Sequence, residues 1–286
     1  MSPVGFIGLG NMGRPMSANL LAAGCELIVY DAAGTAARAP EGASRAASVA
    51  EVATEAEPVF LSLPDGPAVL SVCEEIVTAA PCTTRTVVDL STIGIEAAEE
   101  AARLLDAAGI EYVDSPVSGG VQGARAATLA VMSAGAPGAL ARVEELLKPI
   151  GSSRFVVGSE PGQAQAMKLL NNFLSAVATL ATSEAIRFGE RRGLDMQLML
   201  DVLNASSGRN RATEDKFPRC VLTGTFDNGF TARLLAKDVG LYYHAARQAE
   251  SPASVAELVS EIWAAMAREA PDADTTRMYE FVEREP

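Results

Sequence analysis

The stretch Val4-Gly5-Phe6-Ile7-Gly8-Leu9-Gly10-Asn11-Met12-Gly13 decides the fold of this chain. It begins with a β-branched and aromatic run, which predicts a buried strand. Its glycines then follow the spacing G-x-G-x-x-G, and residues 14–23 continue as an uninterrupted helical segment. A strand, this glycine pattern and a helix in that order are typical of a dinucleotide-binding fold, whereas the pattern alone would also fit a turn in an ordinary α/β domain.

Each glycine of the loop has its own task. Gly8 permits the tight turn from strand to helix, Gly10 lets a pyrophosphate approach the backbone, and Gly13 lets helix and strand pack closely. The free amides and the positive dipole end of the helix then face the anion, so that contact requires no cationic side chain. The predicted cofactor-binding loop comprises Gly8, Leu9, Gly10, Asn11, Met12 and Gly13.

An acidic residue after the second predicted strand favours NAD over NADP. Asp31 follows the apolar residues 27–30, where a carboxylate accepts hydrogen bonds from the ribose hydroxyls and repels a ribose phosphate. Residues 32–35 contain no arginine that would attract such a phosphate, and Arg38 is the nearest residue that argues for NADP. We therefore expect NAD as the cofactor.

Composition excludes several classes of partner. The chain has 286 residues, of which 49% are hydrophobic and 21% charged, as in a soluble globular protein long enough for two domains. Its net charge of -13 argues against a nucleic-acid or anionic-membrane partner, so a small anionic substrate has to be captured locally. Four scattered cysteines and one histidine predict neither a disulfide framework nor a zinc site; we expect no metal and a reducing cytoplasm. No apolar stretch reaches membrane-spanning length, and the N-terminal residues do not read as a secretory signal.

Short apolar strands alternate with alanine-rich helical stretches up to about residue 160. This alternation predicts repeated βαβ units and a largely parallel sheet. The clearest later strands, residues 59–63 and 86–90, end next to small or polar residues, at Pro64-Asp65-Gly66 and Ser91-Thr92. The carboxyl ends of parallel strands open onto a cofactor crevice, so we expect these segments to border the site.

The second half of the chain reads as helical. No proline interrupts the segment Gln163 to Arg192, and Gly193 stands where a helix would end. Further helical segments follow, with breaks that include Pro218. The sequence thus predicts an α/β Rossmann-type N-terminal domain, residues 1–161, and an all-α C-terminal domain, residues 162–286, which begins with the long connecting helix.

Two groups of residues could carry chemistry. Lys168, Asn171, Asn172 and Ser175 recur at spacings of three and four, so they share one face of the long helix. Such a polar stripe fits the border of a cleft, and it also fits a solvated helix face with an extended lysine. The segment Ser118-Gly119-Gly120 exposes backbone amides that could surround a carboxylate, or it could form an ordinary surface turn.

Together these segments resemble the β-hydroxyacid dehydrogenases. The resemblance covers essentially the whole chain, in order and spacing, and is strongest to the 3-hydroxyisobutyrate dehydrogenase branch, which includes tartronate semialdehyde reductases. The four matching signatures are Gly5-Phe6-Ile7-Gly8-Leu9-Gly10-Asn11-Met12-Gly13, Asp114-Ser115-Pro116-Val117-Ser118-Gly119-Gly120, Gly162 through Lys168 to Asn172, and Lys237-Asp238.

The resemblance implies a role for each matching residue. Lys168 would be the catalytic acid/base that takes the hydroxyl proton as hydride leaves for the nicotinamide, and Asn171 and Asn172 would orient substrate and lysine. Burial lowers the pKa of a lysine from about 10.4, which makes a buried lysine a usable base. The family's carboxylate-binding loop corresponds to Ser118, Gly119 and Gly120, and its further cofactor contacts correspond to Leu63, Pro64, Thr92 and Lys237. The family pattern also implies an active site between the domains and a homodimer or homotetramer.

The chain departs from the family after the serine-glycine turn near residue 208. The family's mammalian-type branch commonly has an aromatic residue there, whereas this chain reads Ser207-Gly208-Arg209-Asn210-Arg211. Either Arg209 or Arg211 could bind a polar or anionic group of the substrate, since a guanidinium suits carboxylate oxygens. Both could equally be surface arginines. His244 could face the cleft or serve a structural purpose.

The favoured function is NAD-dependent oxidation of a short β-hydroxy acid to its semialdehyde or keto acid. The nearest alternative is an NADPH-dependent reductase of glyoxylate, succinic semialdehyde or tartronate semialdehyde, against which Asp31 argues. A non-catalytic nucleotide-binding scaffold and an imine reductase are disfavoured by the presence of Lys168. A phosphogluconate-type decarboxylase would carry a much larger helical domain.

Overall fold

The computed structural model describes residues 2–284. The chain divides into two compact units, one extending to Lys168 and the other beginning at Leu169. The division falls inside α8 (Gln163–Arg191), whose first turns belong to the first unit.

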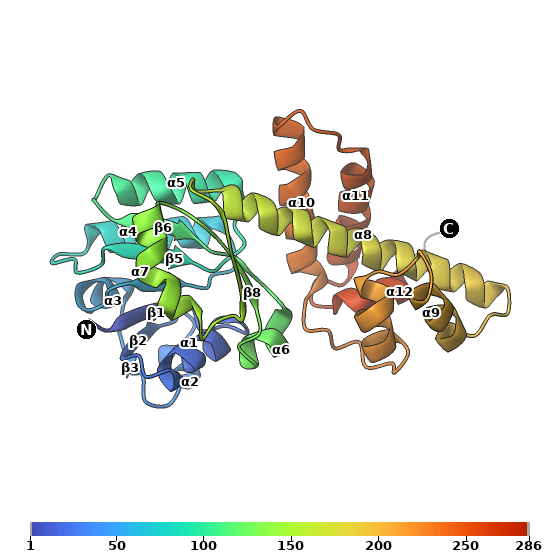
Figure 1. The fold of residues 1–286 in the computed structure, drawn as a ribbon, viewed down its shortest axis with the longest axis horizontal. Coiled ribbons are helices and arrows are strands. Elements are labelled where there is room, and N and C mark those ends of the chain that lie inside the picture. Colours follow the sequence, from blue (N-terminus) through green and yellow to red (C-terminus); the bar gives the residue numbers. More distant parts are fainter. Residues whose placement is uncertain (1, 285–286) are drawn as a thin grey trace. The chain divides into compact units, whose positions relative to one another are not determined.

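A mixed sheet forms the centre of the first unit (Figure 1). Its order within the described residues is β3-β2-β1-β4-β5-β6-β8-β7, with β9 paired to β8. All pairings from β3 to β6 are parallel, as the sequence predicts, whereas β8 runs antiparallel to β6 and β7. The strands are β1 (Val4–Ile7), β2 (Leu27–Tyr30), β3 (Ser44–Arg45), β4 (Val59–Leu61), β5 (Thr86–Asp89), β6 (Glu111–Asp114), β7 (Val117–Ser118), β8 (Ala130–Ala134) and β9 (Ser153–Gly158).

Helices cover both faces of this sheet because its central strands are apolar on both sides. Successive side chains of a strand point to opposite faces. Phe6 therefore packs in the cluster that contains α1, α6 and α7 residues, whereas Ile7 packs with α3, α4 and α5. The helices are α1 (Gly13–Ala22), α2 (Thr35–Arg38), α3 (Val49–Glu55), α4 (Gly66–Thr78), α5 (Ile95–Asp106), α6 (Gly120–Arg125) and α7 (Pro137–Leu147).

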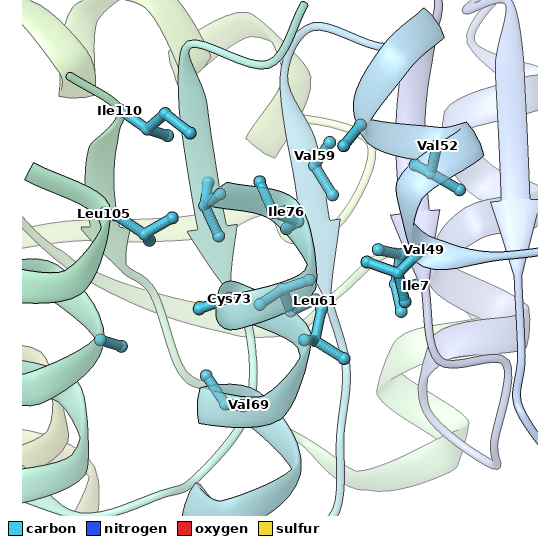
Figure 2. Packing of buried hydrophobic residues seen from close by; sticks show 14 of the residues in the cluster. Ile7, Val49, Val52, Val59, Leu61, Val69, Cys73, Ile76, Leu105 and Ile110 are labelled. Carbon is cyan, nitrogen blue, oxygen red and sulfur yellow. The ribbon is translucent and has the colours of Figure 1, made fainter. Parts of the chain in front are cut away.

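Side chains that cap the first turn determine where α3 and α4 begin. The Asp65 side chain accepts a hydrogen bond from the amide of Ala68 and caps α4, and Ser48 caps α3 through Glu51. Figure 2 shows Val69, Cys73 and Ile76 of α4 in the same core cluster as Ile7 and Leu61 of the strands. This packing fixes the carboxyl ends of β1, β4 and β5, where the candidate site begins.

The second unit is helical, in agreement with the sequence prediction. The segment α8 runs from Gln163 to Arg191 without a break. The other elements are α9 (Met196–Asn204), η1 (Ala212–Val221), α10 (Ala232–Gln248), α11 (Ser254–Glu269), η2 (Thr275–Arg277) and α12 (Met278–Phe281). Ala176, Leu235 and Trp263 are among the core residues that join α8, α10 and α11.

The prediction of a break at Pro218 is wrong. This proline lies inside η1, a π-helix of ten residues with buried Phe217 and Cys220 on either side. A proline cannot donate a backbone hydrogen bond and normally clashes with the preceding turn of an α-helix. The wider i→i+5 turn of a π-helix accommodates it, so the helical path continues.

Candidate active site

The glycine-rich loop, which the sequence predicts to bind a pyrophosphate, turns tightly from β1 into α1. Gly8 has a φ of +95°, and an added Cβ would lie 2.3 Å from the carbonyl oxygen of Ser62. A Cβ on Gly13 would lie 1.9 Å from the carbonyl oxygen of Gly8, so helix and strand could not pack as they do. A Cβ on Gly10, by contrast, would meet nothing within 4 Å. Two glycines are thus required by packing, and the third leaves its backbone open to a ligand.

A cavity of about 620 Å³ adjoins this loop. The loop residues Leu9, Gly10 and Asn11 line one side of it. The remaining lining residues come from α1, α2 and α6 and include the arginines Arg14, Arg38 and Arg125. The cavity is therefore cationic in a protein of net negative charge, which suits the phosphates of a dinucleotide.

Asp31 connects the loop to the end of β2. Its carboxylate accepts hydrogen bonds from the amide of Leu9 at 2.6 Å and from the amide of Ala33 at 2.8 Å. Arg38 Nη1 lies 3.1 Å from the same carboxylate. Asp31 is only 8% exposed, so it fixes the loop from within, and the guanidinium partly offsets its charge. The sequence prediction named the carboxylate as a ribose acceptor and did not foresee this bond to the loop.

The residues after β4 and β5 meet at the same edge of the sheet. The amide of Leu63 donates to Ser91 Oγ at 2.9 Å, which joins the two segments. Pro64 and Thr92 continue these segments; Pro64 is exposed and Thr92 is half-buried. Strand β4 is the parallel neighbour of β1, and β5 is the parallel neighbour of β4. The predicted cofactor contacts Leu63, Pro64 and Thr92 therefore follow strands that end at the same edge as the glycine-rich loop.

A buried carboxylate anchors the first turn of α8. Asp114, at the end of β6, has no exposed surface. Its Oδ2 accepts from the amides of Gly162 at 3.1 Å and Gln165 at 3.0 Å, and its Oδ1 accepts from Gln165 Nε2 at 2.7 Å. Burial raises the pKa of Asp114 to about 7, against the lowering effect of these hydrogen bonds. Neither Asp114 nor Gln165 was predicted from the sequence to have a function.

Gln165 extends this anchor to the loop after β5. Its Oε1 accepts from the amides of Ile93 at 2.9 Å and Gly94 at 3.2 Å, and its Nε2 also donates to the carbonyl oxygen of Ser91. Every polar atom of this buried side chain is thus engaged. Lys168 follows three residues later on the same helix and is 7% exposed, so the network fixes the helical turn that carries it.

The serine-glycine segment links β7 to α6. Ser118 ends β7, Gly119 has a φ of +137°, and α6 begins at Gly120. An added Cβ on Gly119 would lie 2.9 Å from Leu129 Cδ2, and its φ is strained for any other residue. The segment therefore adopts a conformation that requires glycine, and it presents consecutive backbone amides.

In the second unit, Asp238 brings together the predicted polar residues. Asn172 Nδ2 donates to Asp238 Oδ2 at 2.6 Å, and Asn171 Nδ2 donates to Asn172 Oδ1 at 3.1 Å. Lys237 Nζ lies 3.2 Å from Asp238 Oδ1. Asp238 is 2% exposed, so one buried carboxylate contacts both Asn172 and Lys237. Of Lys237 and Asp238, only Lys237 was predicted from the sequence to have a role, although the charge of the adjacent Asp238 was an available signal.

The two arginines in residues 207–211, where the sequence departs from the family pattern, lie on the surface. Arg209 and Arg211 have side chains 64% and 72% exposed, and they pair with Glu214 and Asp215 of the same segment at 3.4 and 3.3 Å. His244 is also exposed. The buried cation of this region is instead Lys216, which the sequence analysis did not single out.

Within residues 2–284, no group of three or more histidine, cysteine, aspartate or glutamate side chains is arranged to hold a metal ion. None of the helices in that range is long and apolar enough to cross a membrane.

Two family descriptions match the chain. Residues 3–158 match the NAD binding domain of 6-phosphogluconate dehydrogenase, and residues 162–282 match the NAD-binding domain of NADP-dependent 3-hydroxyisobutyrate dehydrogenase. Together they span both units.

Individual proteins are similar over nearly their whole length. A probable 3-hydroxyisobutyrate dehydrogenase of Mycobacterium tuberculosis is 35% identical, over 96% of this chain and 95% of the relative. The 2-(hydroxymethyl)glutarate dehydrogenase of Eubacterium barkeri is 32% identical, over 91% of this chain and 87% of the relative. Among solved structures, the M. tuberculosis 3-hydroxyisobutyrate dehydrogenase with L-serine has a TM-score of 0.89 at 33% identity and full coverage of both chains. Psf3 in complex with NADP+ and 2-OPP has a TM-score of 0.84 at 27% identity, over 98% of this chain and 99% of that one.

Proposed function

Since the chain belongs to the β-hydroxyacid dehydrogenase family, in its 3-hydroxyisobutyrate dehydrogenase-like branch, we propose that it oxidises a short β-hydroxy acid with NAD. As a member of this family it is an NAD(P)-dependent oxidoreductase acting on CH–OH groups. We propose Lys168 as the acid/base of the reaction. One observation carries the proposal: a nearly buried lysine lies on a helical turn fixed by Asp114 and Gln165. A general base has to be held within hydrogen-bond reach of the proton that it takes, and a fixed helical turn supports such a position.

The residues of the chain suggest how the reaction proceeds. The nicotinamide supplies the hydride acceptor when bound. Lys168 Nζ takes the proton of the substrate hydroxyl, and returns it when the reaction runs in the reductive direction. Asn172 lies one helical turn beyond Lys168, and its bond to Asp238 leaves its side chain in one orientation for binding the same hydroxyl. Ser118, Gly119 and Gly120 would bind the substrate carboxylate through backbone amides and the serine hydroxyl.

We propose NAD rather than NADP because Asp31 places a carboxylate at the end of β2. Leu63, Pro64, Thr92 and Lys237 would complete the contacts to the cofactor. The second candidate is an NADPH-dependent reductase of glyoxylate, succinic semialdehyde or tartronate semialdehyde. The cationic cavity favours it, since Arg38 stands beside Asp31 and could attract a ribose phosphate.

The names of the relatives define the substrates to examine. One relative acts on 3-hydroxyisobutyrate and another on 2-(hydroxymethyl)glutarate, so small anionic hydroxy acids are the proposed substrates. We further propose a homodimer or homotetramer, with a dinucleotide-binding domain over residues 1–161 and a helical domain over residues 162–286. The cytoplasmic location stays a prediction from the sequence.

A panel assay tests the proposal. Purified protein is assayed with NAD and NADP against 3-hydroxyisobutyrate, glycerate, threonate, serine and semialdehydes. We expect NAD-linked turnover of a β-hydroxy acid, and a loss of kcat by about 100-fold or more in Lys168→Ala. Lys148→Ala is the matched control, since Lys148 is an exposed lysine paired with Glu145.

The outcomes separate the candidate functions. A higher kcat/KM with NADPH and a semialdehyde would favour the reductase. Cofactor binding without any turnover that depends on Lys168 would indicate a nucleotide-binding scaffold and would overturn the proposed catalytic role.

A further inference from the structure

Lys216 is a buried cation without an ionic partner. It lies on η1 and is 8% exposed. Its Nζ donates to Ser175 Oγ at 2.9 Å and to Thr179 Oγ1 at 2.7 Å, both on α8. These acceptors are neutral hydroxyls, and no carboxylate among residues 2–284 forms an ion pair with this lysine. One ammonium hydrogen is left for another group, and no carboxylate contacts the positive charge directly.

This arrangement is costly unless an anion joins it. Burial lowers the pKa of Lys216 from 10.5 to about 8, although Asp274 and Asp215 attract the charged form from a distance. Arg211 and Cys220 are the other titratable groups that act on it. A methionine would fill the same volume without this cost, and buried, unneutralised charges of this kind are concentrated at functional sites.

The hydroxyls that hold Lys216 continue the polar stripe of the candidate site. Ser175 follows Asn172 by three residues on α8, so the two lie on the same helix face. Three residues of an α-helix rise about 4.5 Å, which an extended chain of three or four carbon–carbon bonds would span. A substrate whose hydroxyl lies at Asn172 could thus extend a short side chain along α8 towards Lys216.

We propose that Lys216 determines substrate specificity by binding a second anionic group, so that the preferred substrates are β-hydroxy acids with a carboxylate on the C2 side chain. This inference rests on the proposed function, because it assumes that the hydroxyl is oxidised at Lys168 and Asn172. It assigns to Lys216 the recognition that the sequence analysis considered for Arg209 and Arg211, whose guanidinium groups already pair with carboxylates on the surface.

Kinetics with matched substrates provide the first test. The distal carboxylate of 2-(hydroxymethyl)succinate is compared with its neutral primary amide, which keeps the size and the reacting groups. We expect a kcat/KM at least tenfold higher for the carboxylate, arising mainly from KM. Lys216→Met should reduce this ratio to near one, and Lys216→Arg should restore part of it.

Controls separate recognition from structural damage. Lys148→Met, at an exposed lysine, should leave the ratio unchanged. Distortion of the site by Lys216→Met would lower kcat for both substrates alike and would leave their ratio as in the wild type. An unchanged ratio in Lys216→Met therefore overturns the inference.

Binding without turnover provides the second test. The chain has only four lysines, Lys148, Lys168, Lys216 and Lys237, so isotope-labelled lysine gives few NMR signals, and Lys216→Met identifies the one of interest. Glutarate should raise the pKa of Lys216 by about one unit or more, because an adjacent anion favours the ammonium. Propionate, which has one carboxylate, should shift it less.

The two tests also distinguish failure of the inference from failure of the proposed function. A pKa of Lys216 that does not respond to glutarate overturns the inference, whatever the panel assay shows. A clear response without turnover of any hydroxy acid supports the anion site and overturns the function proposed above.

Discussion

Asp31 and Arg38 oppose each other at the point where the cofactor ribose would bind. The carboxylate repels a ribose phosphate, while the guanidinium at 3.1 Å offsets part of that repulsion. Because Arg38 is 40% exposed, solvent screens its effect, and its contribution should not exceed about 1 kcal/mol. If the cofactor binds as proposed, we therefore expect the balance between NAD and NADP to depend on both side chains rather than on Asp31 alone.

Removing this arginine should sharpen the preference for NAD. In Arg38→Met the carboxylate acts unopposed, so we expect the ratio of kcat/KM for NAD over NADP to rise up to about fivefold. The measurement is the initial rate with each cofactor at one ionic strength. Arg103→Met, at an exposed arginine of α5, is the control and should leave the ratio unchanged. A ratio that stays constant or falls in Arg38→Met would show that this arginine does not offset Asp31 at the cofactor.

Lys216 should make the stability of the protein depend on pH. The unfolded chain keeps this proton up to about pH 10.5, whereas the native state releases it near pH 8. Below pH 8 the buried charge destabilises the native state by roughly 3 kcal/mol, and this cost declines as pH rises from 8 to 10.5. The loss of two hydrogen bonds in Lys216→Met offsets part of the gain from removing the charge.

The expected result is a variant that gains stability relative to the wild type at neutral pH and loses that advantage in alkali. Urea denaturation of wild type and Lys216→Met at pH 7 and pH 10 measures the free energy of unfolding of each. Lys148→Met corrects for the general effect of removing a lysine. A difference between Lys216→Met and wild type that is the same at both pH values would contradict a native pKa near 8.

At the scale of elements, the position of α8 depends on a few hydrogen bonds to Asp114. The carboxylate accepts from two backbone amides and from the Gln165 side chain, and an amide in its place could not accept at both oxygen positions. A buried donor left without an acceptor costs about 1–3 kcal/mol. The same bonds fix the turn of Lys168, so a loss of stability and a loss of activity should appear together.

Asp114→Asn tests this coupling. We expect the free energy of unfolding to fall by about 2 kcal/mol and kcat to fall more than KM changes, because Lys168 is displaced while the cofactor loop is intact. Asp106→Asn, at an exposed aspartate at the end of α5, is the control. If Asp114→Asn retained full kcat at reduced stability, the anchor would serve folding and not the placement of Lys168.

The same elements show which features could be predicted from the sequence. The strands around the glycine-rich loop and the span of α8 were predicted because hydrophobic pattern, proline absence and a terminal glycine are local signals. Asp114 and Gln165 lie 51 positions apart in the sequence, and Lys216 and Thr179 lie 37 apart. No local sequence pattern predicts either hydrogen-bonded pair. The path of η1 through Pro218 was missed because proline propensity describes α-helices and not the wider π-turn.

At the scale of the molecule, the second unit leaves large apolar side chains on its surface. Leu198 and Val202 of α9 are each 56% exposed, and they lie one helical turn apart on the same face. Phe188, near the end of α8, is 67% exposed. Single exposed apolar residues are common, but Leu198 and Val202 on one helix face, with the 52% exposed Leu194 just before the helix, form a stripe that a partner subunit would cover. This stripe supports the homo-oligomer proposed above.

We therefore expect charges on α9 to dissociate the assembly. Burial of a leucine or valine contributes roughly 2 kcal/mol, and an aspartate at a buried contact also loses hydration. In a closed symmetric interface each substitution occurs on both sides, so the double variant Leu198→Asp, Val202→Asp should at least halve the mass measured by light scattering. Gln197→Lys adds a charge to the same helix beside the stripe and should leave the mass unchanged. A wild-type mass of 29.7 kDa, or an undiminished mass in the double variant, would show that α9 is not the interface.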